Sequence, residues 1–396
     1  MNTISFTETF DSCRIFNTHS HHLPDCRQKE LTLPEILQES YVSWCGASIP
    51  GSAAEAGQFL SLVGNRSYFI WLEKSLQELY AIKEPLSSKT WDEYGQKIKD
   101  AHKDADWHMK VLRESCRYEY IVQDSYWDPG DDNGHEVFRP AFRVNSFFFG
   151  YDKNACDHDG KNAQILYSRK ISDIDEYTSF VRDMILEKKR KGCVGIKSAI
   201  AYDRPIRFGP ATKVQAAAAL RYEGTDGSDE DIVHFQDYIF DKICAFAAEF
   251  DLPFQIHTGM GQMNGTNAMQ LQQAINSHPD TTFLLMHGGF PWTDDYVGLV
   301  HYYTNVYADI CWLPLISPNT ARRVMHELIE VCNADKVCWG CDTWTSEESY
   351  GALLALRETL TGVLSEKVAS GYMDPDSAKE YIKKVLYKNA FDIFKV

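Results

Sequence analysis

The chain has 396 residues, 44% of them hydrophobic and 13% aromatic, and a formal net charge of −16. This composition predicts a globular protein with a buried core, organised as one large domain or two ordinary ones. The negative charge argues against a nucleic-acid partner, because binding phosphate requires a basic patch. The longest apolar runs are far shorter than the roughly 20 residues of a membrane span, and no secretion signal is recognisable, so we expect no membrane association.

The cysteines indicate a reducing compartment. There are 11 of them, an odd number, scattered along the chain and mostly in apolar contexts such as Cys244 and Cys311. No CxxC pair suggests a zinc ribbon or a redox motif. This usage favours reduced, buried thiols in a cytoplasmic protein.

The first strand signal ends in two histidines. Residues 13–16 are apolar and suited to a strand, and His19 and His21 follow two positions apart. Alternate side chains of a strand point to the same side, so these two imidazoles can be aimed at one point. Two neutral imidazoles make half of a zinc-type site. A polar turn rich in histidine is the alternative, and His22 should point the other way.

From about residue 41 to residue 114 the pattern is helical. Apolar residues recur near helical spacing within segments 53–62, 66–82, 91–96 and 101–114. The stretch is too long for an ordinary loop. It predicts a helical insertion after the first strand, within a single domain of residues 1–396, which would cover the active site. Its aromatic residues are better explained as local core than as substrate contacts.

Strands and helices then alternate. Further strands are expected at residues 118–122, 138–148, 193–198, 253–257, 282–287, 305–309 and 336–340. Helical patterns at 171–191, 229–249, 317–331 and 346–364 lie between them. Eight short buried strands, most followed by helices, predict an α/β fold of the (β/α)8 TIM-barrel type.

Such a barrel keeps its chemistry at the carboxyl ends of its strands. The residues at those positions are His19, His21, Lys197, His257, His287 and Asp342. Three imidazoles and a carboxylate suit a divalent cation, and Asp342 could also take a proton from a water. His287 is either a further ligand or an acid/base group that polarises the substrate. Taken singly, His257 and His287 could be hydrogen-bonded core residues, and Asp342 could be a helix N-cap.

The order of these residues resembles the amidohydrolase superfamily of metal-dependent barrels. Residues 255–261 (QIHTGMG) and 286–289 (MHGG) are most similar to its amidohydrolase-2 branch. Residues 195–202 (GIKSAIAY) resemble the amidohydrolase-like domain that some fungal and bacterial proteins carry fused to glutamine synthetase. Residues 68–72 and 91–93 resemble uronate isomerase. The likeness covers nearly the whole chain, but its metal motif says little about the substrate.

The resemblance implies that His19, His21, His257 and Asp342 hold one divalent ion, most often zinc in this superfamily, with His287 acting near the substrate. Lys197 remains open among three roles. It could be a carbamylated bridge to a second metal ion, a cation for a substrate carboxylate, or a lysine paired with a barrel carboxylate.

Weaker candidates surround this set. Arg143 and Arg204 could each clamp a substrate carboxylate, or could form structural salt bridges. Asp124 and Asp309 also end strands and could orient the ligands. Tryptophans 312, 339 and 344 could wall the pocket, although core packing would explain them equally well.

These observations predict a metal-dependent hydrolase of a small amide or lactone that is acidic or carbohydrate-derived. The metal would lower the pKa of bound water toward ~7, Asp342 would accept the proton, and His287 would polarise the carbonyl. A uronate-isomerase-like proton shuttle, a non-oxidative decarboxylase on the same ligand set, and a catalytically inactive binding barrel are the alternatives. A homo-oligomer is compatible with such a barrel, but no stretch indicates one.

Overall fold

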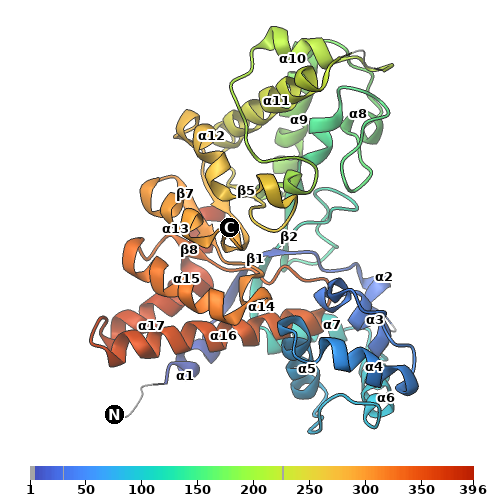
Figure 1. Ribbon diagram of the computed structural model, residues 1–396, viewed down its shortest axis with the longest axis vertical. Coiled ribbons are helices and arrows are strands. Elements are labelled where there is room, and N and C mark those ends of the chain that lie inside the picture. Colours follow the sequence, from blue (N-terminus) through green and yellow to red (C-terminus); the bar gives the residue numbers. More distant parts are fainter. Residues whose placement is uncertain (1–4, 30, 225–226) are drawn as a thin grey trace.

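Eight parallel strands form the centre of the molecule (Figure 1). The computed structural model describes residues 5–29, 31–224 and 227–396, so the predicted single domain of residues 1–396 extends over seven residues outside that part. The strands are β1 (Ile15–Ser20), β2 (Tyr118–Gln123), β3 (Phe138–Arg143), β4 (Gly195–Ser198), β5 (Phe254–Ile256), β6 (Phe283–Leu285), β7 (Val306–Asp309) and β8 (Val337–Cys338). Each strand pairs in parallel with the next in chain order. This is the predicted (β/α)8 barrel.

Backbone hydrogen bonds close the barrel between β1 and the segment after β8. The amide of Thr18 donates to the carbonyl of Trp339 at 3.2 Å, and the amide of Asp342 donates to the carbonyl of His19 at 2.9 Å. The approach requires glycine at position 340, because a Cβ there would lie 2.5 Å from the His19 nitrogen. Closure therefore brings the histidines of β1 beside Asp342.

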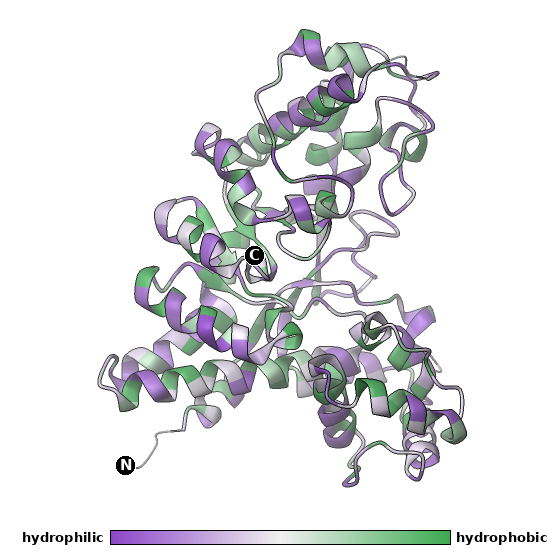
Figure 2. Ribbon diagram, viewed as in Figure 1, coloured by the Kyte–Doolittle hydropathy of each residue, from purple (hydrophilic) through white to green (hydrophobic). Residues whose placement is uncertain are grey.

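Helices surround the strands. They are α1 (Thr7–Asp11), α8 (Ala163–Leu166), α9 (Ile174–Arg190), α10 (Lys213–Ala219), α11 (Asp229–Glu249), α12 (Gln272–Ser277), α13 (Thr293–Tyr302), α14 (Leu313–Ile316), α15 (Pro318–Val331), α16 (Ser346–Ala369), α17 (Pro375–Lys383) and α18 (Asn389–Phe394). In α15 the buried residues Ala321, Val324 and Leu328 recur at helical spacing. Figure 2 shows hydrophobic and hydrophilic residues side by side on the same outer helices, as expected where one face packs inward.

Between β1 and β2 the chain forms a group of helices with an apolar cluster of its own. They are α2 (Asp25–Gln28), α3 (Leu33–Gln38), the 3-10 helix Tyr41–Cys45, α4 (Ala53–Val63), α5 (Ser67–Leu79), α6 (Trp91–Ala101) and α7 (Trp107–Lys110). Leu33, Leu72 and Tyr94 are buried together in their cluster. Figure 1 shows these helices gathered at one side of the molecule, where α5 packs against α16.

One predicted strand was too long. The expected strand 138–148 stops at Arg143, and Asn145–Phe149 forms a 3-10 helix. The run Phe147-Phe148-Phe149 has the composition of a strand, but Phe147 and Phe148 are both fully buried whereas Phe149 is only half-buried. Consecutive side chains of this run thus reach the same core, which a strand with alternating sides would not allow.

The C-terminal helices α17 and α18, with a π-helical turn over Lys384–Lys388 between them, were not predicted. In the described part of the chain, no helix combines the length and apolarity that crossing a membrane would require.

Candidate active site

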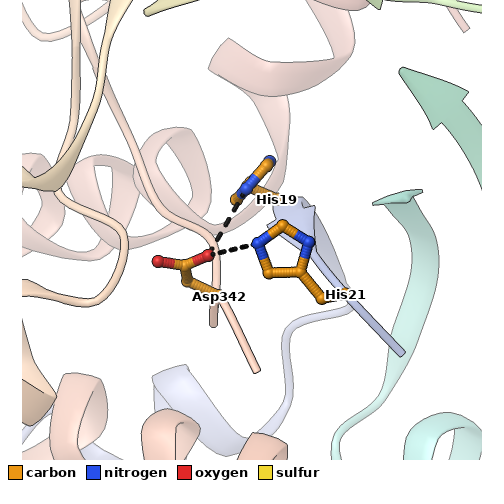
Figure 3. Close-up of side chains that lie close together, drawn as sticks. All are labelled: His19, His21 and Asp342. Atoms are coloured by element: carbon orange, nitrogen blue, oxygen red, sulfur yellow. Dashed lines mark ion pairs between the residues drawn. The ribbon is translucent and has the colours of Figure 1, made fainter. Parts of the chain in front are cut away.

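His19, His21 and Asp342 lie together at the mouth of the barrel (Figure 3). His19 is near the end of β1, His21 follows that strand, and Asp342 follows β8. The Nε2 atoms of His19 and His21 lie 3.4 and 3.2 Å from the same carboxylate oxygen of Asp342, Oδ1. All three side chains are buried, and their potential ligand atoms lie within 4.8 Å of one another. This is the convergence that the His-x-His pattern suggested.

The environment of the two histidines fits a divalent cation. The Nδ1 atom of His21 lies 2.8 Å from the carbonyl oxygen of Asp124, which orients its Nε2 toward Asp342. Among the described residues, neither ring nitrogen of the fully buried His19 has a hydrogen-bond partner. Burial and the nearby Lys197 hold the pKa of His19 well below its usual value, so its imidazole is neutral. A buried neutral imidazole without partners is costly, and a coordinated ion would satisfy its lone pair.

Asp342 is an ionised acceptor. Burial alone would raise its pKa, but the hydrogen bond with His21 and the nearby His287 and His19 outweigh this and hold the pKa well below the usual value. The hydroxyl of Tyr41 donates to its Oδ2 at 2.9 Å. The carboxylate therefore offers Oδ1 to the two histidines of β1 and Oδ2 to other groups.

His257 and His287 contact each other. The Nε2 atom of His287 lies 2.8 Å from Nδ1 of His257, and Nε2 of His257 is hydrogen-bonded to the carbonyl of Met260. The structure thus does not bring His257 into the group of His19, His21 and Asp342, and its role as a ligand stays a prediction. Burial lowers the pKa of His287 to about 3, and burial together with His287 lowers that of His257, so both rings are neutral.

Of the three candidate cations, two reach the site. Arg143 lies 3.3 Å from Asp124 and 2.6 Å from Asp159. Lys197 Nζ lies 2.6 Å from the sulfur of Met286, and it forms no ion pair within the described ranges. Burial lowers its pKa. Arg204 instead binds Asp237 of α11 at 2.9 Å and does not line the pocket.

The pocket over the site has a volume of about 250 Å³. Its lining residues are His19, His21, Tyr41, Trp44, Tyr126, Arg143, His158, Asp159, Lys197, Tyr202, His257, His287, Asp342 and Trp344. Sequence reasoning missed Tyr41, Trp44, Tyr126, Tyr202 and the pair His158–Asp159, which all come from connections rather than strand ends. A run of aromatic residues directly after a strand, as at Tyr126 and Trp127, was the only local signal.

The remaining candidates lie around the pocket. Trp344 lines it, whereas Trp312 is buried behind it and stacks on Tyr41 with ring centroids 4.7 Å apart. Trp339 is a buried core residue. Asp309 accepts a hydrogen bond from Thr18 at 2.6 Å and supports β1 from below the site.

Taken together, the site offers neutral imidazoles, an ionised carboxylate and two buried cations around a small space. Neutral nitrogen and carboxylate oxygen are the donors that zinc and similar divalent ions prefer. Arg143, which is paired with Asp124 and Asp159, and Lys197 are basic residues of the lining.

The chain has relatives among known proteins, both in sequence and in fold. The chain is 25% identical over 150 residues to Protein fluG of Emericella nidulans, a match that covers 36% of this chain and 17% of that much longer protein. The uronate isomerase of Thermotoga maritima superimposes with a TM-score of 0.77 at 15% identity, covering 99% of this chain and 98% of that one. The glucuronate isomerase of Caulobacter crescentus also gives 0.77 at 15% identity, covering 98% and 93%. At this identity, the two isomerases show a shared fold.

The profile of the amidohydrolase family matches residues 196–396, which is more than half of the chain and includes Lys197, His257, His287 and Asp342. The chain therefore belongs to the amidohydrolase family of metal-dependent enzymes.

Proposed function

We propose that this enzyme hydrolyses an amide or lactone bond in a small carboxylate-bearing substrate, with one divalent ion, zinc, held by His19, His21 and Asp342. The observation that carries the proposal is the buried group of two neutral imidazoles and one ionised carboxylate at the base of a pocket. Such an ion would supply a Lewis acid and lower the pKa of a water toward ~7. His257 remains a candidate fourth ligand after a rotation of its ring.

The chain's own residues would hold and orient the substrate. Arg143 is fixed by two carboxylates, and Lys197 has the smaller and more adaptable charge, so the pair can hold a substrate carboxylate from two sides. Asp342 is the proton acceptor, and it shares Oδ2 with the hydroxyl of Tyr41. His287 is a neutral ring with its Nδ1 at 3.5 Å from Asp342. Its one N–H is on Nε2 and is donated to His257 in this structure, so polarising the carbonyl being attacked would require this N–H to turn toward the substrate.

We also propose that the whole chain works as one domain, in which the helices between β1 and β2 cover the active site. Tyr41 and Trp44 of this segment line the pocket, and Tyr41 contacts Asp342 directly. The cover excludes water and limits the size of the substrate. The volume of about 250 Å³ suits a molecule smaller than a typical drug. The unpaired thiols of all 11 cysteines support a cytoplasmic location.

The test combines metal analysis with a substrate panel. We expect the purified enzyme to contain a divalent ion and to open uronate-derived lactones or cleave amides of small acids. Asp342→Asn should lose at least ~10³-fold in kcat, whereas the matched variant Asp294→Asn should not change it, since that carboxylate is 83% exposed on α13. Full activity after metal removal, or full activity of Asp342→Asn, would reject the proposal.

Isomerisation of a uronate is the second candidate. It is favoured by the similarity to uronate isomerases over nearly the whole chain, including the helices between β1 and β2, and by the cations of the pocket. The same panel separates the two reactions: a hydrolase gives a ring-opened acid, an isomerase gives a keto acid, and a decarboxylase would release CO₂.

A further inference from the structure

A second group of metal-ligand atoms lies beside the first. His287, Cys311 and Asp342 follow the ends of β6, β7 and β8 in succession, all three are buried, and their ligand atoms lie within 4.8 Å of one another. His287 Nδ1 is 3.2 Å from the sulfur of Cys311 and 3.5 Å from Oδ2 of Asp342. Ligand atoms of one zinc ion, bonded at about 2.0–2.3 Å, lie about 3–4 Å apart in a tetrahedron. The two distances from His287 match a single coordination sphere.

The hydrogen bonds determine which ring nitrogen of His287 carries the lone pair. The carbonyl of Met260 can only accept, so Nε2 of His257 carries the proton and its Nδ1 accepts from Nε2 of His287. His287 must then have its lone pair on Nδ1, facing the thiol of Cys311. An ion between Cys311 and His287 would use this lone pair without disturbing the bond to His257.

Asp342 divides its two oxygens between the two groups. Oδ1 faces His19 and His21, at 3.4 and 3.2 Å. Oδ2 lies 3.5 Å from Nδ1 of His287, and Cys311 completes the second group. A carboxylate whose oxygens face separate sets of donors is arranged to bridge two ions, which in paired sites lie about 3.5–4 Å apart.

We propose that His287, Cys311 and Asp342 form a second divalent-cation site, in which the Cys311 thiolate is a ligand and Asp342 bridges the two ions. The inference deepens the proposed function, because it concerns the same pocket. Binding exchanges the S–H bond for a sulfur–metal bond and releases the proton to solvent, with no change of oxidation state. A thiolate, an imidazole and a carboxylate together select Zn²⁺ or Co²⁺ over Mg²⁺ or Ca²⁺.

The backbone at these positions supports a functional role. His287, Trp312 and Asp342 have φ angles of 67°, 62° and 59°, a left-handed conformation that side chains rarely adopt. Each such residue costs about 1 kcal/mol or more, and this strain persists mainly where function requires a particular geometry. Two of the three residues are donors of the second site, and Trp312 directly follows the third donor, Cys311.

The position of Lys197 distinguishes this site from a lysine-bridged one. Its Nζ lies 2.6 Å from the sulfur of Met286, and each of the two groups already has three ligand atoms without it. In the proposed site Lys197 stays a cation for substrate, and the second ion depends on sulfur instead.

The test is a titration of the metal-free full-length protein with Co²⁺. Thiolate ligation gives an intense charge-transfer band in the near ultraviolet, which oxygen and nitrogen ligands do not produce. We expect the band as the second equivalent binds, and a sulfur neighbour in X-ray absorption at the cobalt edge. In Cys311→Ser the band should disappear, and the second equivalent should bind ~100-fold or more weakly. This loss exceeds the ~10–100-fold expected if Cys311 only hydrogen-bonded to the ligand His287. Serine keeps a hydroxyl donor toward His287, so it separates ligation from hydrogen bonding.

Two variants serve as controls. Cys244→Ser removes a buried thiol of α11 that lies outside the site and should keep the band. His19→Ala removes a donor of the first group only and should also keep the band while losing activity. A wild-type protein saturated with Co²⁺ that shows neither band nor sulfur neighbour overturns the inference, as does an unchanged band in Cys311→Ser. If the metal-free enzyme still hydrolyses its substrate, but the Co²⁺-loaded enzyme shows the band, the proposed function fails and the second site stands.

Discussion

Replacing either of two adjacent glutamates at the start of α16, Glu347 or Glu348, by glutamine should change the stability of the protein, in opposite directions. Glu347 is fully buried, and its Oε1 accepts hydrogen bonds from Tyr80 at 2.7 Å, His102 at 3.0 Å and Trp107 at 3.2 Å. Glu348 is also buried, and the amide of Tyr41 donates to its Oε1 at 2.7 Å, but no side chain among the described residues donates to it. These bonds tie the helices between β1 and β2 to the segment that carries Asp342.

Their pKa values differ accordingly. Burial alone would raise the pKa of Glu347, but the hydrogen bond and charge of His102 and the hydroxyl of Tyr80 outweigh it and lower the pKa to about 2. Burial raises the pKa of Glu348 to about 8, against the smaller opposite effect of the Tyr41 amide. At pH 6, Glu347 is therefore ionised and Glu348 is neutral in the folded protein.

We expect Glu347→Gln to lower the free energy of unfolding at pH 6 by about 3 kcal/mol, the value of a pKa lowered from 4.5 to about 2. Removing one partner of a buried pair typically costs a similar amount. This contribution of Glu347 is present above its unfolded pKa near 4.5 and is lost as the pH falls toward 2. Glu348→Gln should instead stabilise the protein by about 2 kcal/mol at pH 6, because folding no longer has to protonate a carboxylate that is ionised in the unfolded chain. This gain should grow as the pH rises to about 8.

The assay is urea unfolding of the metal-free protein between pH 5 and pH 8, with the midpoint read from tryptophan fluorescence. Glu358→Gln is the matched control on the same helix, because its carboxylate is 67% exposed and 3.6 Å from Lys74, an arrangement worth less than about 1 kcal/mol. Equal effects of the two buried variants, or destabilisation by both with no dependence on pH, would refute the reasoning.

Three further changes test the barrel closure, the pocket cations and the metal. Gly340→Ala should destabilise the protein by about 1–3 kcal/mol, because the new Cβ would lie 2.5 Å from the backbone nitrogen of His19. Thermal melting measures this loss. Gly298→Ala is the control that should not lower the melting temperature by steric conflict, since nothing lies within 4 Å of its Cβ. Arg143→Lys should raise KM for acidic substrates ~10-fold or more, because an ammonium group cannot contact Asp124 and Asp159 as the planar guanidinium does. Arg204→Lys, which lies away from the pocket, should leave KM unchanged in the same steady-state assay. Chelation should abolish activity and Zn²⁺ should restore it in a stopped assay, with unchanged activity counting against the metal site.

The barrel could be predicted because its strands carry their own signal. Residues 283–285 are all buried in β6, and a continuous apolar run is what a strand covered on both faces requires. Strand ends are also readable, because a polar residue directly after such a run marks where the core stops. That rule locates His287 after β6 and Asp342 after β8 from the sequence alone.

The same rule fails where the residue after the strand is not polar. Cys311 lies two residues past the end of β7, as His287 does past β6, but it stands within the apolar run 310–313, so no change of polarity marks it. Its sulfur lies 3.2 Å from Nδ1 of His287. In the sequence, this cysteine looks like any other buried thiol. The ring of His257 shows the opposite failure: its position after β5 was readable, but its hydrogen bond to Met260 depends on a loop conformation that strand periodicity does not encode.

The candidate metal ligands could be predicted from the sequence, but the residues that select the substrate could not. The candidate ligands lie at strand ends, where period-two alternation and parallel pairing bring their side chains to one edge of the sheet. The walls of the pocket come from Tyr41, Trp44, Tyr126 and Tyr202, which belong to long connections and a 3-10 helix. Their positions follow from packing between segments far apart in the chain, such as the stacking of Tyr41 on Trp312. If the proposed function holds, we therefore expect replacement of Trp44, Tyr126 or Tyr202 to change the preference among substrates of the panel and to leave the content of divalent ion unchanged.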